Sequence, residues 1–296
     1  MQILITGGTG FIGQALIASL PHHEFTVLTR DTKRARQRLG DRHTYLSSLA
    51  QLSHLSDFDA VINLAGEPIA DGRWTIQKKR AICDSRWQIT AKLTALLDNS
   101  QEPPRCWLNA SAIGIYGPRD STPVDESASL QATDFAAQVC ERWEQLARRA
   151  EERTRLCILR IGLVMHPEGG ALKKMLPPFR LGLGGRIGDG QQMMSWIHRD
   201  DLVALFGFLL ENDDACGVFN ATAPNPVSNQ VFTETLAKTL GKPALLPAPE
   251  FALKLAFGEM SILLLTGQAV VPRAAQDAGF IFHYPKLDEA LGQLLA

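Results

Sequence analysis

A glycine-rich turn near the start of the chain constrains the fold more than any other feature of the sequence. The segment Thr6-Gly7-Gly8-Thr9-Gly10-Phe11-Ile12-Gly13 follows an apolar run, Gln2–Thr6, and opens an expected helix from about Phe11 to Leu20. Glycines at this spacing allow a tight turn in which phosphate oxygens approach backbone N–H groups, while the helix points its positive end at the pyrophosphate. This context predicts dinucleotide binding, and a purely structural glycine turn is the alternative.

Strands and helices alternate through the rest of the first half of the chain. Such alternation is typical of a parallel sheet covered by helices on both faces, so we expect an α/β fold, a doubly wound sheet of the Rossmann type. The further expected strands are Phe25–Thr29, His43–Leu46, Ala60–Leu64, Cys106–Ala110 and Leu156–Leu163. The further expected helices are Thr32–Leu39, Ile76–Leu97 and Asp134–Arg153.

The chain changes character after about Met165, where Gly-rich and Pro-rich segments begin. We expect a dinucleotide-binding domain over residues 1–165, to which a strand and a helix return from about residues 195–222. Residues 166–296 would then form a smaller, mostly helical C-terminal lobe. Its late helices are predicted at Asn229–Leu240, Pro249–Leu265 and Leu287–Leu294.

Composition and charge argue against several other classes of protein. Thirty basic and thirty-one acidic residues leave a net charge of -1, so no global field attracts nucleic acid or an anionic membrane. The N-terminal run is typical of a first strand rather than a signal peptide, and the apolar stretch Phe251–Thr266 is too short and too polar to span a bilayer. Five cysteines without CxxC spacing indicate reduced thiols, so we expect a cytoplasmic protein.

The end of the expected second strand bears on the choice of cofactor. An acidic side chain there would accept hydrogen bonds from the ribose hydroxyls and select NAD, but this strand is followed by Arg30 and then Asp31. A guanidinium can pair with a 2′-phosphate, and Lys33 and Arg34 follow on the next turn. We therefore expect NADP(H). The alternative is NAD(H), with Asp31 on the ribose and Arg30 as a solvated charge.

Three segments together resemble the extended short-chain dehydrogenase/reductases, the group that contains nucleotide-sugar epimerases. They are the glycine turn, Asn63-Leu64-Ala65-Gly66 and Ser111-Ala112-Ile113-Gly114-Ile115-Tyr116-Gly117. Leu159-Arg160-Ile161-Gly162 and Ser195-Trp196-Ile197-His198-Arg199-Asp200-Asp201 strengthen the resemblance. Gly66-Glu67-Pro68-Ile69, Gly72-Arg73-Trp74, the segment after Pro178 and the ending Ala278-Gly279-Phe280 are similar to an atypical "epimerase family protein" subgroup with a C-terminal domain of unknown function.

The resemblance implies an NADP(H)-binding oxidoreductase or epimerase-like enzyme whose substrate is an unidentified small molecule. The expected cofactor-binding residues are Gly7, Thr9, Gly10, Phe11, Ile12, Gly13, Arg30, Leu64, Ala65 and Gly66. The alternative is a catalytically silent NADPH-binding sensor or scaffold. Relatives of this kind are often dimers, so the chain is expected to be a monomer or a homodimer, with Trp143 either at the dimer interface or in the core.

The Tyr-x-x-x-Lys pair that carries proton transfer in the wider family is missing. The three tyrosines are followed four residues later by leucine or aspartate, never by lysine. In the expected helix, Phe135 takes the tyrosine place and Val139 the lysine place, on an apolar stripe at helical spacing. Phenylalanine cannot donate a proton and valine cannot bind a ribose hydroxyl, so the usual proton relay is unavailable.

Ser111, Tyr116 and Arg86 are the remaining candidates for catalysis. Ser111 matches the family serine and would polarise the reacting oxygen, although it could also be a strand-end turn residue. Tyr116 would contact substrate or act as a substitute acid, with packing as the alternative. Arg86 belongs, with Arg73, Lys79 and Ser85, to a polar set that could line the cleft. Lys78 and Lys79 could instead be solvated charges.

Two further parts of the sequence carry residues of the kinds found at ligand sites. The His198-Arg199-Asp200-Asp201 segment lacks the second His or Cys that a metal site needs, so we expect no metal and a capping role before a helix from Leu202. Arg160, Arg180 and Arg186 suggest an anionic substrate. The run Pro177-Pro178-Phe179-Arg180 and its glycines would suit a loop that folds over a ligand, with a flexible surface loop as the alternative.

Overall fold

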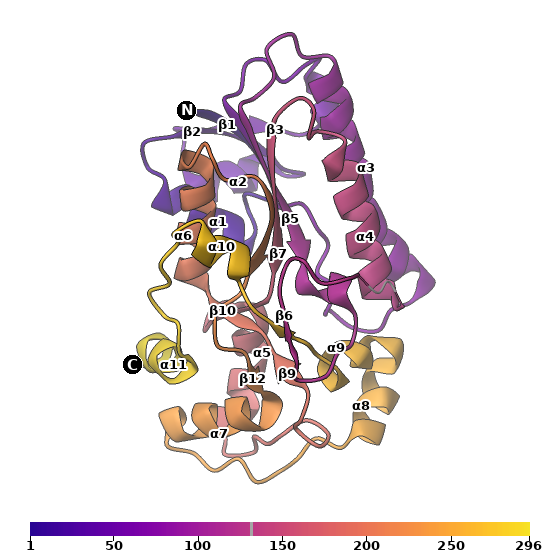
Figure 1. Cartoon of the computed structure of the whole chain (residues 1–296), viewed down its shortest axis with the longest axis vertical. Helices are drawn as coiled ribbons and strands as arrows, with labels where there is room; N and C mark the ends of the chain where they lie inside the picture. The colour runs from indigo at the N-terminus through magenta and orange to yellow at the C-terminus, as the bar shows by residue number, and fades with distance from the viewer. Residues whose placement is uncertain (131–132) are drawn as a thin grey trace.

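A seven-stranded parallel sheet forms the centre of the upper half of the molecule (Figure 1). The structure is a computed structural model that describes residues 1–130 and 133–296. The strand order is β11-β7-β5-β4-β1-β2-β3, and every neighbouring pair is parallel. The strands are β1 (Gln2–Thr6), β2 (Glu24–Leu28), β3 (Thr44–Leu46), β4 (Ala60–Asn63), β5 (Cys106–Ala112), β7 (Arg155–Ile161) and β11 (Gly217–Ala221). The predicted doubly wound α/β fold is confirmed.

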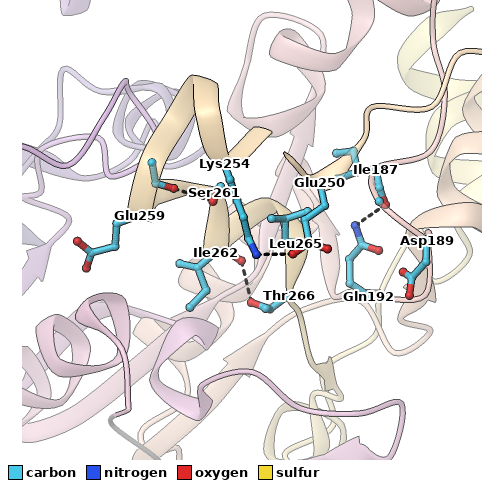
Figure 2. A pocket seen from close by; sticks show the side chains of 12 residues that line it. Ile187, Asp189, Gln192, Glu250, Lys254, Glu259, Ser261, Ile262, Leu265 and Thr266 are labelled. Carbon is cyan, nitrogen blue, oxygen red and sulfur yellow. Dashed lines mark hydrogen bonds and ion pairs between the residues drawn. The ribbon is translucent and has the colours of Figure 1, made fainter. Parts of the chain in front are cut away.

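The lower half of the molecule is the predicted small helical lobe (Figure 1). Its helices are α5 (Gly170–Arg180), α7 (Asn229–Leu240), α8 (Glu250–Phe257), α9 (Ile262–Leu265) and α11 (Leu287–Leu295). Its short strands are β8 (Leu163–His166), β9 (Met193–Met194), β10 (Trp196–His198), β12 (Val227–Ser228) and β13 (Ala269–Val270), the last paired with β6 (Pro123–Val124). Between α8, α9 and the loop after α5 lies a cavity of about 630 Å³ (Figure 2).

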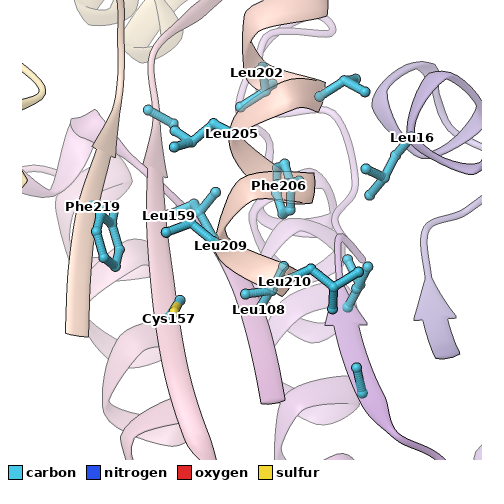
Figure 3. Close-up of a cluster of buried hydrophobic side chains, with 14 of the residues drawn as sticks. Leu16, Leu108, Cys157, Leu159, Leu202, Leu205, Phe206, Leu209, Leu210 and Phe219 are labelled. Atoms are coloured by element: carbon cyan, nitrogen blue, oxygen red, sulfur yellow. The ribbon is translucent and has the colours of Figure 1, made fainter. Parts of the chain in front are cut away.

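Helices cover both faces of the sheet. On one face lie α1 (Phe11–Ser19), α2 (Thr32–Leu39), α6 (Arg199–Glu211) and α10 (Arg273–Asp277), and on the other lie α3 (Ile76–Asp98) and α4 (Phe135–Arg148). Successive strand residues point to opposite faces, so both sets must be apolar. Leu108, Cys157 and Leu159 pack against Phe206 and its neighbours on α6 (Figure 3), whereas Trp107 packs with the buried side chains of α3.

Several expectations about local structure were wrong. The predicted helix Pro249–Leu265 is interrupted at Gly258, whose φ of +59° favours glycine, and a short 3-10 turn, η3 (Gly258–Ser261), separates α8 from α9. The run Pro177–Arg180 is the last part of helix α5 and not a loop over a ligand. Helix α6 begins at Arg199, three residues before the predicted Leu202.

The predicted long strand Leu156–Leu163 divides in two. The chain leaves the sheet at Gly162, where a Cβ atom would lie 2.6 Å from the Ser195 carbonyl oxygen. This close approach separates β7, in the main sheet, from β8, which pairs with β10 in the lobe. None of the helices in the described part of the chain combines the length and hydrophobicity that a transmembrane segment needs.

Candidate active site

The glycine turn between β1 and α1 is packed too tightly for side chains. Gly7 has a φ of +69°, and a Cβ atom there would lie 2.5 Å from the Leu64 carbonyl oxygen. A Cβ atom on Gly13 would lie 2.5 Å from the carbonyl oxygen of Gly7. Both positions therefore require glycine, and the turn is pressed between the end of β4 and the first turn of α1.

The N-terminus of α1 is left open by this turn. Gly10 is the N-cap residue, and no side chain caps the helix. The side-chain amide of Gln14 donates to the Thr9 carbonyl oxygen (2.8 Å) and so stabilises the turn, but it does not accept a hydrogen bond from the first N–H groups of the helix. First-turn N–H groups have no intrahelical partner. The amides of Phe11 and Ile12 are therefore suited to a pyrophosphate, as the sequence predicts.

A row of buried polar side chains ties the turn to the neighbouring strands. The Thr6 hydroxyl donates to Asn63 Oδ1 (2.6 Å) and accepts from the backbone N–H of Ala65 (3.1 Å). Asn63 Nδ2 donates to Asn109 Oδ1 (2.7 Å) and to Thr90 Oγ1 (2.9 Å). These bonds fix the turn that follows β4. Sequence reasoning missed them, although polar residues inside strands expected to be buried were a usable signal.

Arg30 and Asp31 have different environments at the end of β2. The Asp31 carboxylate accepts the backbone N–H of Arg34 (2.9 Å) and is the N-cap of α2. The Arg30 side chain is exposed and has no hydrogen bond or ion pair to another described residue. Asp31 is thus engaged in capping, whereas the guanidinium of Arg30 is available to a ligand.

A buried hydrogen-bond network surrounds Ser111, at the end of β5. The Ser111 hydroxyl donates to Glu144 Oε1 (2.7 Å), and Arg160 donates to both oxygens of Glu144 (2.9 and 2.8 Å). Arg160 also donates to the hydroxyl of Tyr116 (2.9 Å), which donates to Asn220 Oδ1 (2.8 Å). All five side chains are at most 3 % exposed. The network therefore joins β5, α4, β7, β11 and the 3-10 turn η2 (Ile113–Tyr116).

This network directs three candidate groups inward. Burial raises the pKa of Tyr116, against the opposing effect of Arg160. Burial alone would lower the pKa of Arg160, but the hydrogen bonds and the charge of Glu144 raise it. Tyr116 lies in the interior, as the packing alternative supposed, and Arg160 is held by Glu144 rather than exposed to a substrate. Glu144 was not expected, because one carboxylate on the apolar face of a helix gives no recognisable motif.

Phe135 lies in the first turn of α4 and Val139 in the second, at the places where the sequence predicts the family tyrosine and lysine. Val139 is buried in an apolar cluster with Trp74 and Met260, and Phe135 packs edge-on against Trp74 with ring centroids 4.9 Å apart. Met260 belongs to η3, so the C-terminal lobe covers this part of α4. Lys79 Nζ lies 4.8 Å from the centroid of the Phe135 ring. Trp143, in contrast, is buried in the core and donates to Thr90.

Arg86 supports the turn after β4. Its guanidinium donates to the Glu67 carbonyl oxygen (3.0 Å), lies 5.2 Å from the Trp143 ring centroid, and would be 2.9 Å from a Cβ atom on Gly66. Burial lowers the pKa of Arg86. Ser85 accepts the backbone N–H of Glu67 (2.8 Å). Arg86 and Ser85 thus hold the backbone next to the expected cofactor site.

The His198–Asp201 segment joins α6 to the C-terminal region. His198 is the N-cap of α6 and accepts the Asp200 N–H (3.1 Å), so the cap is the histidine and not an aspartate. Asp201 is fully buried and accepts the N–H groups of His283 and Tyr284 (both 2.9 Å). Across the described ranges, no group of three or more His, Cys, Asp or Glu side chains is arranged to hold a metal ion.

The cavity beside α8 has a mixed polar and apolar lining (Figure 2). Asp189 and Gln192 come from the loop after α5, Glu250 and Lys254 from α8, and Glu259 from η3. Glu250 and Lys254 form an ion pair. Arg180 and Arg186, which suggested an anionic substrate, are exposed and are not part of this lining.

The fold and the glycine turn define a dinucleotide-binding protein of the Rossmann type, and comparison with known proteins gives its family. The sequence model of the NAD dependent epimerase/dehydratase family matches residues 3–221, and that of a domain of unknown function, DUF1731, matches residues 248–294. The chain belongs to the NAD dependent epimerase/dehydratase family.

Within this family the chain is similar along its whole length to one group of relatives. It is 39% identical to "Epimerase family protein SDR39U1 homolog, chloroplastic" of Arabidopsis thaliana, covering 100% of this chain and 87% of the relative. It is 38% identical to Epimerase family protein YfhF of Bacillus subtilis, covering 100% and 98%. The crystal structure of human epimerase family protein SDR39U1 (isoform 2) with NADPH superimposes with a TM-score of 0.91 at 34% identity, covering 99% of both chains. The resemblance predicted from the sequence is confirmed.

Proposed function

We propose that the chain binds NADP(H) at the glycine turn and acts as an oxidoreductase or epimerase-like enzyme on a small molecule. The observation that carries the proposal is the uncapped N-terminus of α1 behind a turn that admits only glycine at positions 7 and 13. When bound, the nicotinamide supplies or accepts hydride. The chain's part is to hold the pyrophosphate at the amides of Phe11 and Ile12 and to place the nicotinamide over the ends of β4 and β5.

The exposed guanidinium of Arg30 supports a preference for NADP(H) over NAD(H). A 2′-phosphate beyond the end of β2 would lie within its reach and could pair with it bidentately. Asp31, which would otherwise bind the ribose of NAD, caps α2. The human relative solved with NADPH supports the same choice.

A paired titration with NADPH and NADH, followed by nicotinamide fluorescence, tests this proposal. We expect Arg30→Ala to weaken NADPH binding by roughly 10- to 100-fold, because a charge-assisted hydrogen bond is lost, and to leave NADH binding within about twofold. Arg36→Ala is the matched control, since it removes the same charge from an exposed side chain in the last turn of α2. Equal affinity for the two cofactors before and after the Arg30 change would contradict the assignment.

A further inference from the structure

We propose that the ammonium group of Lys79, positioned by Glu259, is the proton donor and acceptor of the reaction, in place of the missing tyrosine. This inference rests on the proposed function, because it assumes hydride transfer at the same edge of the sheet. It assigns a chemical role to two residues from distant parts of the chain, one in the first turn of α3 and one in η3 of the C-terminal lobe.

The position of Lys79 is the first argument. Helix α3 follows β4 and helix α4 follows β5, so the first turns of both helices lie beyond the carboxyl edge of the sheet, on the side where ligands of this fold bind. Lys79 belongs to the first turn of α3, and Nζ lies 4.8 Å from the ring centroid of Phe135, in the first turn of α4. The amino group therefore stands beside the side chain that replaces the tyrosine.

The orientation and the exposure of the Lys79 amino group are the second argument. Lys79 Nζ donates to both oxygens of Glu259 (2.6 and 2.8 Å), which fixes the long side chain in one orientation. The side chains are 32 % and 53 % exposed, so a ligand and water can reach the pair. Glu259 also belongs to the lining of the 630 Å³ cavity, at the end opposite Asp189, and its carboxylate points away from the other labelled lining side chains (Figure 2).

The other candidate donors in this region are less suitable. The proton of Ser111 is already donated to Glu144, and the hydroxyl of Tyr116 is directed into the interior. Cys83, one turn after Lys79 on α3, is half-buried, and burial raises the pKa of its thiol. The neighbouring Lys78 is directed elsewhere, because its Nζ donates to Glu67 Oε1 (2.8 Å) in the turn after β4.

The step balances without a further reactant. In the reducing direction the carbonyl carbon of the substrate would accept hydride from NADPH, which is thereby oxidised to NADP⁺. The carbonyl oxygen would take a proton from the Lys79 ammonium, which gives the alcohol and a neutral amine. The neutral amine is then reprotonated from water, and the reverse direction runs through the same atoms. Ammonium groups and phenols are weak acids of similar strength in water, so lysine can replace tyrosine in this task.

The test measures the protonation of Lys79 and needs no substrate. The protein would be labelled by reductive methylation with formaldehyde and a borane across a pH series, alone, with NADPH and with NADP⁺, and modification at each lysine would be quantified by mass spectrometry. Only the neutral amine reacts. If Lys79 faces the nicotinamide, the positive ring of NADP⁺ should move its labelling midpoint about 0.5 pH unit or more below that with NADPH.

Lys254 is the matched control, because it lines the same cavity and is paired with a glutamate on its own helix. Its midpoint should not respond to the oxidation state of the cofactor. Glu259→Gln removes the partner that orients the side chain and should reduce the difference between the NADPH and NADP⁺ midpoints. Cofactor binding measured by fluorescence on the same samples separates the two claims. Binding with identical Lys79 midpoints for NADPH and NADP⁺ overturns the role of Lys79 alone, whereas no binding overturns the proposed function.

Discussion

Two ends of the same sheet edge differ in how their polar groups are used. The cofactor half, which comprises the glycine turn and the end of β2, has an uncapped helix N-terminus and an exposed Arg30. The reaction half, which comprises the end of β5 and the starts of α3 and α4, has Ser111 bonded to Glu144 and apolar side chains, Phe135 and Val139, at the positions predicted for the family tyrosine and lysine.

The difference teaches where this chain departs from its wider family. The groups proposed to meet a phosphate have no side-chain partner among the described residues, whereas Ser111 is paired internally and the positions predicted for the tyrosine and lysine carry apolar side chains. The C-terminal lobe contributes to the reaction half, since Met260 belongs to the same apolar cluster as Val139 and Glu259 accepts hydrogen bonds from Lys79. The reaction half therefore includes residues of the lobe, whereas the cofactor half is built from the sheet and its first two helices.

Restoring the family pair should have the largest effect on stability. Val139 is 1 % exposed among apolar side chains, so Val139→Lys would bury an unpaired ammonium and should lower the free energy of unfolding by about 4 kcal/mol or more. Phe135 is only partly buried, so Phe135→Tyr should change it by less than about 1 kcal/mol. Urea denaturation measures both. Equal losses of unfolding free energy for the two changes would show that water reaches position 139 and that this site is not a closed apolar cluster.

Breaking the buried ion pair should have the next largest effect. Arg160→Met leaves the carboxylate of Glu144 buried without its bidentate partner and should lower the free energy of unfolding by about 3–4 kcal/mol. Arg148→Met is the control, because Arg148 is 42 % exposed and 3.8 Å from Glu144. If both changes cost the same in urea denaturation, the network does not stabilise the reaction half.

A change in the cofactor half should affect binding as much as folding. Gly13→Ala places a Cβ atom against the Gly7 carbonyl, so we expect a loss of about 1–3 kcal/mol in stability and weaker NADPH binding through the displaced turn. Gly292→Ala on α11 meets no atom within 4 Å and should be neutral or slightly stabilising. Unchanged NADPH affinity in Gly13→Ala would contradict the proposal that the glycine turn binds the cofactor.

Sequence reasoning succeeded where the signal is local. The glycine turn, the position of Arg30 and the absence of Tyr-x-x-x-Lys can all be recognised within short segments, and the strand–helix alternation predicted the sheet. It failed where the outcome depends on tertiary contacts. Lys79 and Glu259 are 180 residues apart, and nothing local pairs them. Helix α5 was missed because Pro177 and Pro178 indicate a loop, since each removes a backbone N–H donor, yet both lie in the last turn of the helix.

A crystal structure of the chain with NADPH would test the central claim most directly, because it examines both halves at once. We predict the pyrophosphate at the amides of Phe11 and Ile12, the 2′-phosphate beside Arg30, and the nicotinamide next to the first turn of α4, facing Lys79. A 2′-phosphate away from Arg30, or a nicotinamide turned away from α4, would contradict the account.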